Sequence, residues 1–256
     1  MRLFRHSKAI VLVLSVCLLM GLVPGSRFTA AARAAEPIVT VEKTIACFGD
    51  STTWGDNGTG KGGPAISWTS HMAELTGAAK VLNFGVKGSR IAVKADRDDS
   101  FVERFGEYGM ASDVICLFGG VNDFCRNVPV GAPEDKDVHT FYGALTWLVE
   151  QIAEKYPESI LVGMTPCKTA GVPRKGLPAY NAANDLGFVE EDYADAFLDV
   201  MHRFGVPTID LFRESTISPL LPAHRERYMP DGLHYSPAGY ERLARRIAAG
   251  LAAIVG

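Results

Sequence analysis

A serine, a histidine and an aspartate in this 256-residue chain have the types and spacing of a nucleophilic site. Ser51 directly follows the apolar run 45–48 and the dipeptide Gly-Asp. A serine hydroxyl attacks efficiently only when a base takes its proton, and an imidazole does this near neutral pH. His234 is the candidate base, and Asp231 lies three residues earlier, close enough in a turn to hold the other ring nitrogen. These residues predict attack on a carbonyl carbon.

Such an attack places negative charge on the carbonyl oxygen, which needs preorganised hydrogen-bond donors. The candidate donors are the backbone N–H groups of Ser51 and Gly85 and the side-chain amide of Asn122. Gly85 lies in the segment Asn-Phe-Gly-Val-Lys-Gly at 83–88, and Asn122 follows a pair of glycines. We therefore expect these donors to surround the reacting oxygen.

Alternating strands and helices must bring these distant residues together. Apolar runs typical of buried strands occur at 45–49, 81–84, 113–118, 159–163 and 206–211. Helices are predicted at 68–76, 138–152, 189–204 and 237–254, the last with Ser236 as its cap; loops are predicted at 165–184 and 212–235. This order favours an α/β fold with a doubly wound, mostly parallel sheet and helices on both faces. The carboxyl ends of its strands would share one edge, where Ser51, Gly85, Asn122 and His234 could meet.

Four sequence blocks occur in the order of a known hydrolase family. They are Gly49-Asp50-Ser51, the 83–88 segment with Gly85, Gly120-Val121-Asn122-Asp123 and Asp231-Gly232-Leu233-His234. The chain resembles the SGNH hydrolases, also called the GDSL esterase/lipase family, over essentially all of residues 36–256. Thr52 stands where the name-giving motif has leucine.

This resemblance implies a flavodoxin-like three-layer α/β/α sandwich with five parallel strands, no cofactor, and hydrolysis of carboxylic esters. It implies Ser51 as nucleophile, Gly85 and Asn122 as oxyanion donors, and His234 with Asp231 as base and orienting group. The residues present agree with that assignment. The Gly-x-Ser-x-Gly motif of the other large serine-esterase fold does not occur in the sequence.

The first 35 residues have the order of a secretory signal peptide. Three basic residues precede an apolar run at 9–23, and a small-residue tail with Ala32-Arg33-Ala34 offers a cleavage site. We expect cleavage after Ala34 or nearby, a single hydrolase domain at 36–256, and a secreted or extracytoplasmic protein. An uncleaved anchor is the alternative. Residues 36–256 hold 21 Lys and Arg against 29 Asp and Glu, a net charge of −8 that does not favour a nucleic-acid partner.

No structural zinc site is expected, because the sequence has no Cys-x-x-Cys spacing or Cys/His cluster. A catalytic metal is not expected either, because Asp231 and His234 lack a second ligand cluster. A disulfide between Cys125 and Cys167 stays open, since both are expected in loops. His71, His139, His202 and His224 are expected to be solvated or structural. Lys87 and Arg90 could contact an anionic substrate group, although a solvated role is favoured.

The sequence therefore predicts a secreted serine esterase that works through an acyl-enzyme. No added apolar segment would shelter a long fatty chain, so we expect a short acyl group, such as acetyl on a carbohydrate. Within the same family, a lipase, lysophospholipase or thioesterase is the alternative. A glycan-binding module without turnover, on the same fold, is the alternative from another functional class. We expect no stable membrane insertion once the signal is removed.

Overall fold

The computed structural model describes residues 42–255, which are built around one five-stranded sheet. The strands are β1 (Thr44–Gly49), β2 (Lys80–Gly85), β3 (Val114–Phe118), β4 (Ile160–Met164) and β5 (Thr208–Ile209). They pair in the order β2-β1-β3-β4-β5, and every pairing is parallel. The predicted flavodoxin-like α/β fold is confirmed. The predicted signal peptide at 1–35 lies outside the described residues.

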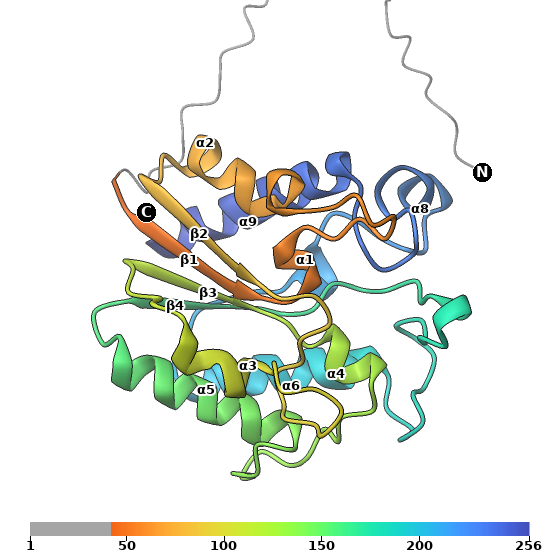
Figure 1. The fold of residues 1–256 in the computed structure, drawn as a ribbon, viewed down its shortest axis with the longest axis horizontal. Coiled ribbons are helices and arrows are strands. Elements are labelled where there is room, and N and C mark those ends of the chain that lie inside the picture. The colour runs from red at the N-terminus through yellow and green to blue at the C-terminus, as the bar shows by residue number, and fades with distance from the viewer. Residues whose placement is uncertain (1–41, 256) are drawn as a thin grey trace, which may run out of the picture. The chain divides into compact units, whose positions relative to one another are not determined.

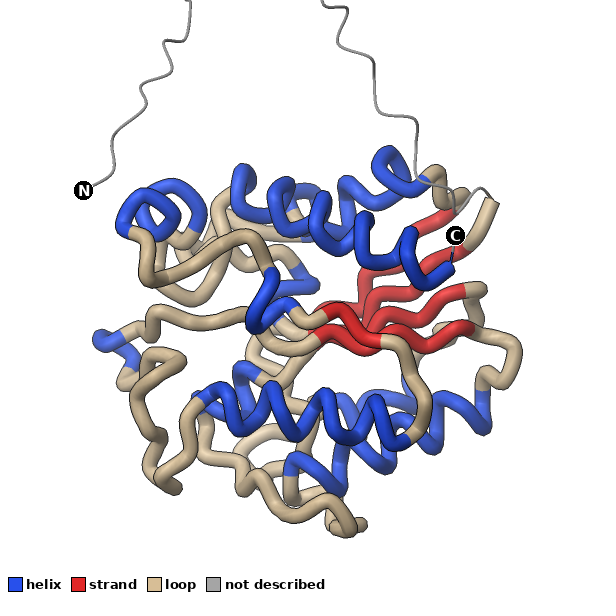
Figure 2. The backbone as a smooth tube through the Cα atoms, turned by 180° about the vertical axis from the view of Figure 1, so that it is seen from behind, coloured by secondary structure: helices blue, strands red, loops and turns tan. Residues whose placement is uncertain are grey.

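Two helical layers cover the sheet (Figure 1). One contains α2 (Met72–Thr76) and α9 (Pro237–Val255), and the other contains α3 (Phe101–Arg104), α5 (Phe141–Lys155) and α6 (Glu190–Arg203). Figure 2 shows the strands lying between these layers from behind. The predicted cap Ser236 accepts from the N–H of Gly239. Gly77, in the left-handed region, ends α2.

Alternation along the central strands explains why helices lie on both faces. Ala46 and Phe48 pack in a core with α5 and α6, whereas Ile45 and Cys47 pack in a second core with α9. Successive strand side chains point to opposite faces, so a strand that is apolar at every position must be covered twice. The continuous apolar run at 45–48 thus specifies a central strand.

Short helical segments follow the carboxyl ends of the strands. They are α1 (Ser51–Trp54), the 3₁₀ turns η1 (Pro64–Ile66) and η2 (Trp68–His71), η3 (Phe105–Glu107) after α3, α4 (Val121–Cys125), η4 (Pro173–Lys175), α7 (Leu211–Glu214) and α8 (Pro222–Tyr228). Because β1 pairs with β2 on one side and β3 on the other, the chain winds in opposite directions from β1. Ligands bind at such a switch point in open α/β sheets, and α1 and α4 begin there.

Two predictions were wrong, one about the last strand and one about the loop after it. The predicted strand at 206–211 is only two residues long, since Asp210 already caps α7 by accepting from the N–H of Arg213. The predicted loop at 212–235 contains α8, which buries none of its residues and therefore leaves no apolar periodicity in the sequence. No described helix is both long and apolar enough to cross a membrane.

Candidate active site

Ser51 is held in a tight turn between β1 and α1. A Cβ atom at Gly49 would lie 2.0 Å from Thr53 Oγ1 and 2.9 Å from the carbonyl oxygen of Phe118, so only glycine allows α1 to fold back this closely. Asp50 caps α1 by accepting from the N–H of Thr52 at 2.8 Å. Ser51 is therefore fixed at the first position of the helix, with 4% of its surface exposed.

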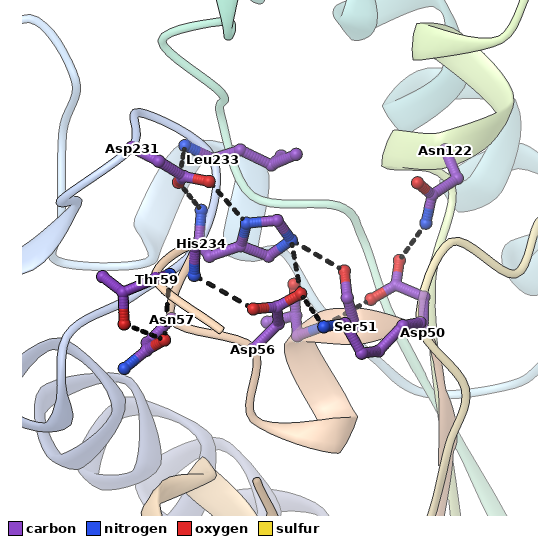
Figure 3. A network of polar contacts seen from close by, with 12 residues as sticks. Asp50, Ser51, Asp56, Asn57, Thr59, Asn122, Asp231, Leu233 and His234 are labelled. Carbon is purple, nitrogen blue, oxygen red and sulfur yellow. Dashed lines mark hydrogen bonds and ion pairs between the residues drawn. The ribbon is translucent and has the colours of Figure 1, made fainter. Parts of the chain in front are cut away.

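The predicted nucleophile, base and orienting group lie in one hydrogen-bonded line (Figure 3). His234 Nε2 is 3.1 Å from Ser51 Oγ, and His234 Nδ1 is 2.8 Å from Asp231 Oδ2. The other Asp231 oxygen accepts from the backbone N–H groups of Leu233 and His234 at 3.0 and 2.8 Å. The three residues come from opposite ends of the chain, and all three side chains are largely buried.

The environment of Asp231 keeps it ionised. Burial disfavours the charged form, but hydrogen bonds from the His234 side chain and backbone, together with the charge of His234, lower the pKa of Asp231 well below its ordinary value. A carboxylate in this position fixes the tautomer of His234 that leaves Nε2 facing Ser51, and it stabilises a protonated imidazole. The pair can therefore take up the hydroxyl proton of Ser51.

A second carboxylate lies near the other side of the imidazole. Asp56 Oδ2 is 3.8 Å from His234 Nε2 and only 2.8 Å from Lys87 Nζ. Burial opposes ionisation of Asp56, but the bond from Lys87 and the charge of His234 lower its pKa. The sequence interpretation did not single out Asp56, because no motif connects it with Asp231.

Asn122 lies in α4, on the same cavity as Ser51. Its amide nitrogen donates to the carbonyl oxygen of Ser89 at 3.1 Å and to Asp50 Oδ2 at 3.3 Å. Burial raises the pKa of Asp50 to about 6, an effect that the N–H of Thr52 partly offsets. The predicted amide is thus present beside Ser51, fixed by two acceptors.

Gly85 does not occupy the position expected of an oxyanion donor. Its N–H already donates to Asn83 Oδ1 at 2.9 Å, and Gly85 is not among the residues that line the cavity. A Cβ atom there would lie 2.1 Å from the backbone nitrogen of Trp54, so this glycine allows β2 to pack against α1. Gly88 lines the cavity instead, and its N–H bonds to no acceptor among residues 42–255. Both glycines belong to one short segment, and only the path of the chain distinguishes them.

Two buried charged residues hold the backbone near the site, Arg104 at two strand ends and Asp123 at the loop that follows β2. The Arg104 guanidinium donates to the carbonyl oxygens of Gly49 and Phe84 at 2.7 and 2.9 Å, and burial lowers its pKa to about 10. Asp123 accepts from the N–H groups of Ile91 and Ala92, each at 2.9 Å, and burial raises its pKa to about 7. A hydrogen-bonding role was expected for Asp123, whereas no role was predicted for Arg104.

The cavity beside Ser51 has a volume of about 160 Å³. It is lined by Ser51, Asp56, Lys87, Gly88, Asn122, Arg126, Lys175, Leu177, Leu233 and His234. The histidines expected to be solvated or structural do not line it. Cys125 and Cys167 are both free and buried, so the disulfide that the sequence left undecided is not formed in this structure. The described residues contain no group of three or more His, Cys, Asp or Glu side chains placed to hold a metal ion.

Comparisons with known proteins agree with this fold and its motifs. Residues 47–242 match the GDSL-like lipase/acylhydrolase family. One crystal structure is 60% identical, with a TM-score of 0.82, over 83% of this chain and 97% of its own. A protein from Lactobacillus plantarum is 28% identical, with a TM-score of 0.73, over 83% and 98%.

A lipase/acylhydrolase from Enterococcus faecalis shares the fold at 21% identity and a TM-score of 0.59, over 83% of this chain and 96% of its own. No curated protein matches the chain significantly. The family match covers most of the chain and all of the residues of the hydrogen-bonded line. This chain belongs to the GDSL-like lipase/acylhydrolase family.

Proposed function

We propose that this protein is a serine esterase that hydrolyses carboxylic esters through an acyl-enzyme on Ser51. The observation that carries the proposal is the hydrogen-bonded line from Ser51 Oγ through His234 to Asp231. It is supported by membership of a family of lipases and acylhydrolases. A serine becomes a nucleophile when an adjacent base takes its proton, and here a third group also orients that base.

In the proposed reaction, Ser51 Oγ attacks the ester carbonyl carbon while His234 Nε2 takes its proton. The tetrahedral intermediate then breaks the bond to the alcohol oxygen, which receives the proton from His234. A water molecule attacks the acyl-enzyme, again giving a proton to His234, and release of the acid returns the proton to Ser51 Oγ. Asp231 stabilises the imidazolium that forms in both halves.

For the oxyanion we assign the N–H groups of Ser51 and Gly88 and the amide of Asn122. Gly88 takes the role first expected of Gly85, because its N–H is free and it lines the cavity. The longer bond of Asn122, at 3.3 Å to Asp50, is the one that a substrate oxygen would replace. Catalytic hydrogen bonds commonly tighten only when substrate is bound.

A short acyl group suits the site best. The cavity at Ser51 is small, and Leu177 and Leu233 are the only two large apolar side chains among its lining residues. A second hollow of about 480 Å³ lies beside Asp231, lined by Gly58, Thr59, Val172, Pro173, Arg174, Pro230 and Asp231. We propose that the acyl group, such as acetyl, enters the small cavity and that a larger alcohol, such as a carbohydrate, extends into the second hollow.

We further propose that the protein acts outside the cytoplasm after cleavage near Ala34. The basic, apolar and small-residue order of residues 1–35 supports this location. The mass of the protein isolated after expression in a bacterial host tests it. A mass that includes residues 1–34 would contradict cleavage.

The proposed activity is tested with p-nitrophenyl acetate, butyrate and palmitate. We expect highest kcat/KM on acetate, with turnover abolished in Ser51→Ala and retained in the control Ser70→Ala, an exposed serine. A preference for palmitate would indicate a lipase or lysophospholipase, and a faster reaction with acyl thioesters would indicate a thioesterase. Turnover that persists in Ser51→Ala would contradict the mechanism. Inactivity on every ester, with binding of glycans, would favour the binding module.

A further inference from the structure

The cavity at Ser51 is lined by more positive than negative side chains, in contrast to the chain as a whole. Three of its lining residues are cationic, Lys87, Arg126 and Lys175, whereas Asp56 is the only carboxylate among them. The chain from residue 36 onward has a net charge of −8. A local excess of positive charge on an acidic protein raises the local concentration of anions at that place.

One of the three cations is already neutralised within the site. Lys87 Nζ lies 2.8 Å from Asp56 Oδ2 and 4.9 Å from the centre of the Trp54 ring. The pKa of Asp56 is lowered, so this carboxylate stays charged and keeps Lys87 paired. Arg90, the other cation considered from the sequence, is buried, pairs with Asp96 and does not line the cavity.

The other two cations have no such partner. The Arg126 and Lys175 side chains make no ion pair or hydrogen bond with any residue from 42 to 255. Other exposed arginines, such as Arg174 and Arg225, also form no ion pair among the described residues, but Arg126 and Lys175 line the cavity that contains Ser51. Two uncompensated cations therefore face one small cavity that also contains Ser51.

The two cations come from separate parts of the chain. Arg126 ends α4, whereas Lys175 lies at the tip of a hairpin in which Val172 and Leu177 form an antiparallel bridge. The left-handed conformation of Gly176, with φ at 67°, closes that tip. The sequence interpretation placed an irregular loop there, so the approach of Lys175 to the cavity was not foreseen.

The hairpin is anchored to the site itself. At its base, the N–H of Ala170 donates to the carbonyl oxygen of Gly232 at 2.7 Å, and Thr169 Oγ1 donates to the same oxygen at 3.2 Å. Gly232 lies in the turn between Asp231 and His234. Lys175 is thus carried by a segment that is bonded to the residues around the reacting centre.

We infer that the substrate is an ester with a negatively charged group, a carboxylate or a phosphate, close to the bond that is cleaved. Arg126 and Lys175 hold that group, Arg126 as a planar donor that matches its oxygens and Lys175 as a point charge. Lys87 stays with Asp56 and does not contribute net charge. This inference rests on the proposed esterase function and specifies its substrate class.

The test compares pairs of esters that differ in one charge. The first pair, 4-acetoxybenzoate and methyl 4-acetoxybenzoate, places the charge on the alcohol part. The second pair, the mono-4-nitrophenyl ester of succinate and 4-nitrophenyl butyrate, places it on the acyl part. Each kcat/KM is measured above the uncatalysed rate, which is high for the succinate ester because its carboxylate attacks the neighbouring carbonyl. The ratio within each pair is then compared between wild type and variants, so that intrinsic reactivity cancels. A preference for the charged ester in either pair is expected, and the responding pair shows which part carries the anion.

The variant Arg126→Gln/Lys175→Gln should reduce that preference about tenfold. Each exposed charge pair contributes up to about fivefold, and the two factors multiply. The control Lys43→Gln/Lys80→Gln removes the same charge at the amino ends of β1 and β2, the opposite edge of the sheet, and should leave the preference unchanged. Thermal unfolding checks that each variant is folded.

Independently of any variant, the preference should weaken when salt rises from about 0.02 to 0.5 M, because ions screen exposed charges. Equal kcat/KM for charged and neutral esters would overturn the inference, and so would a preference that neither the double variant nor salt reduces. In either case, turnover that depends on Ser51 would still support the esterase function. Turnover of both esters in Ser51→Ala would instead overturn the esterase function itself.

Discussion

Glu190 allows a sharp test of how burial controls the stability of this fold. The side chain is fully buried at the start of α6, where one carboxyl oxygen accepts from the N–H of Thr169 at 2.9 Å. The other oxygen has no hydrogen-bond partner among the described residues. Burial raises the pKa of Glu190 from 4.5 to about 8, although the Thr169 N–H offsets part of this rise.

A raised carboxyl pKa means that folding favours the protonated form. The contribution of Glu190 to the free energy of unfolding is therefore constant below about pH 4.5, the pKa in the unfolded chain. It becomes less favourable as pH rises toward about 8. At about 1.4 kcal/mol per pH unit, the free energy of unfolding falls by about 3 to 5 kcal/mol over this window. Glu190→Gln keeps the shape and does not titrate, so it should avoid that decline.

The measurement is urea unfolding of wild type and Glu190→Gln at about pH 5, 7 and 9. The variant's advantage in unfolding free energy should grow at each step, because only the wild type must bury a carboxylate. Glu191→Gln, which changes an exposed neighbour on α6, is the matched control and should show no such growth. A difference between wild type and Glu190→Gln that is constant with pH would refute the reasoning.

Three further substitutions test the site and its support. Asn122→Ala should lower kcat by roughly 10² to 10³ with little change in KM, as expected for loss of an oxyanion donor; an unchanged kcat would exclude this role. Gly85→Ala should destabilise the fold in thermal unfolding, because the new Cβ meets the backbone of Trp54, whereas full stability would show that α1 can shift without penalty. Arg104→Lys should lower the unfolding free energy by about 2 to 4 kcal/mol, since one ammonium cannot reproduce the bonds to two strand ends. A loss below about 0.5 kcal/mol in urea unfolding would contradict that account.

Much of the fold could be predicted because its patterns are local. The apolar run before Ser51 specifies a buried central strand, and the apolar faces over 138–152 and 237–254 specify α5 and α9. Helix α8 was missed because it has no buried face, and β5 was overextended because Asp210 caps a helix where the apolar pattern continues. Local pattern thus predicted the buried elements well and the exposed ones poorly.

The sequence by itself determined the chemistry that is available: Ser51, His234, Asp231 and Asn122 were chosen from residue type, order and strand-end position. Only the tertiary structure decided how they are placed. It brings Asp56 to His234, gives Gly88 rather than Gly85 a free N–H at the cavity, and brings Arg126 and Lys175 to the same cavity. The physical reason is that a reactive group is recognised by its own chemistry, whereas a neighbour across the fold depends on the path of loops, which hydrogen bonds and packing between distant segments fix.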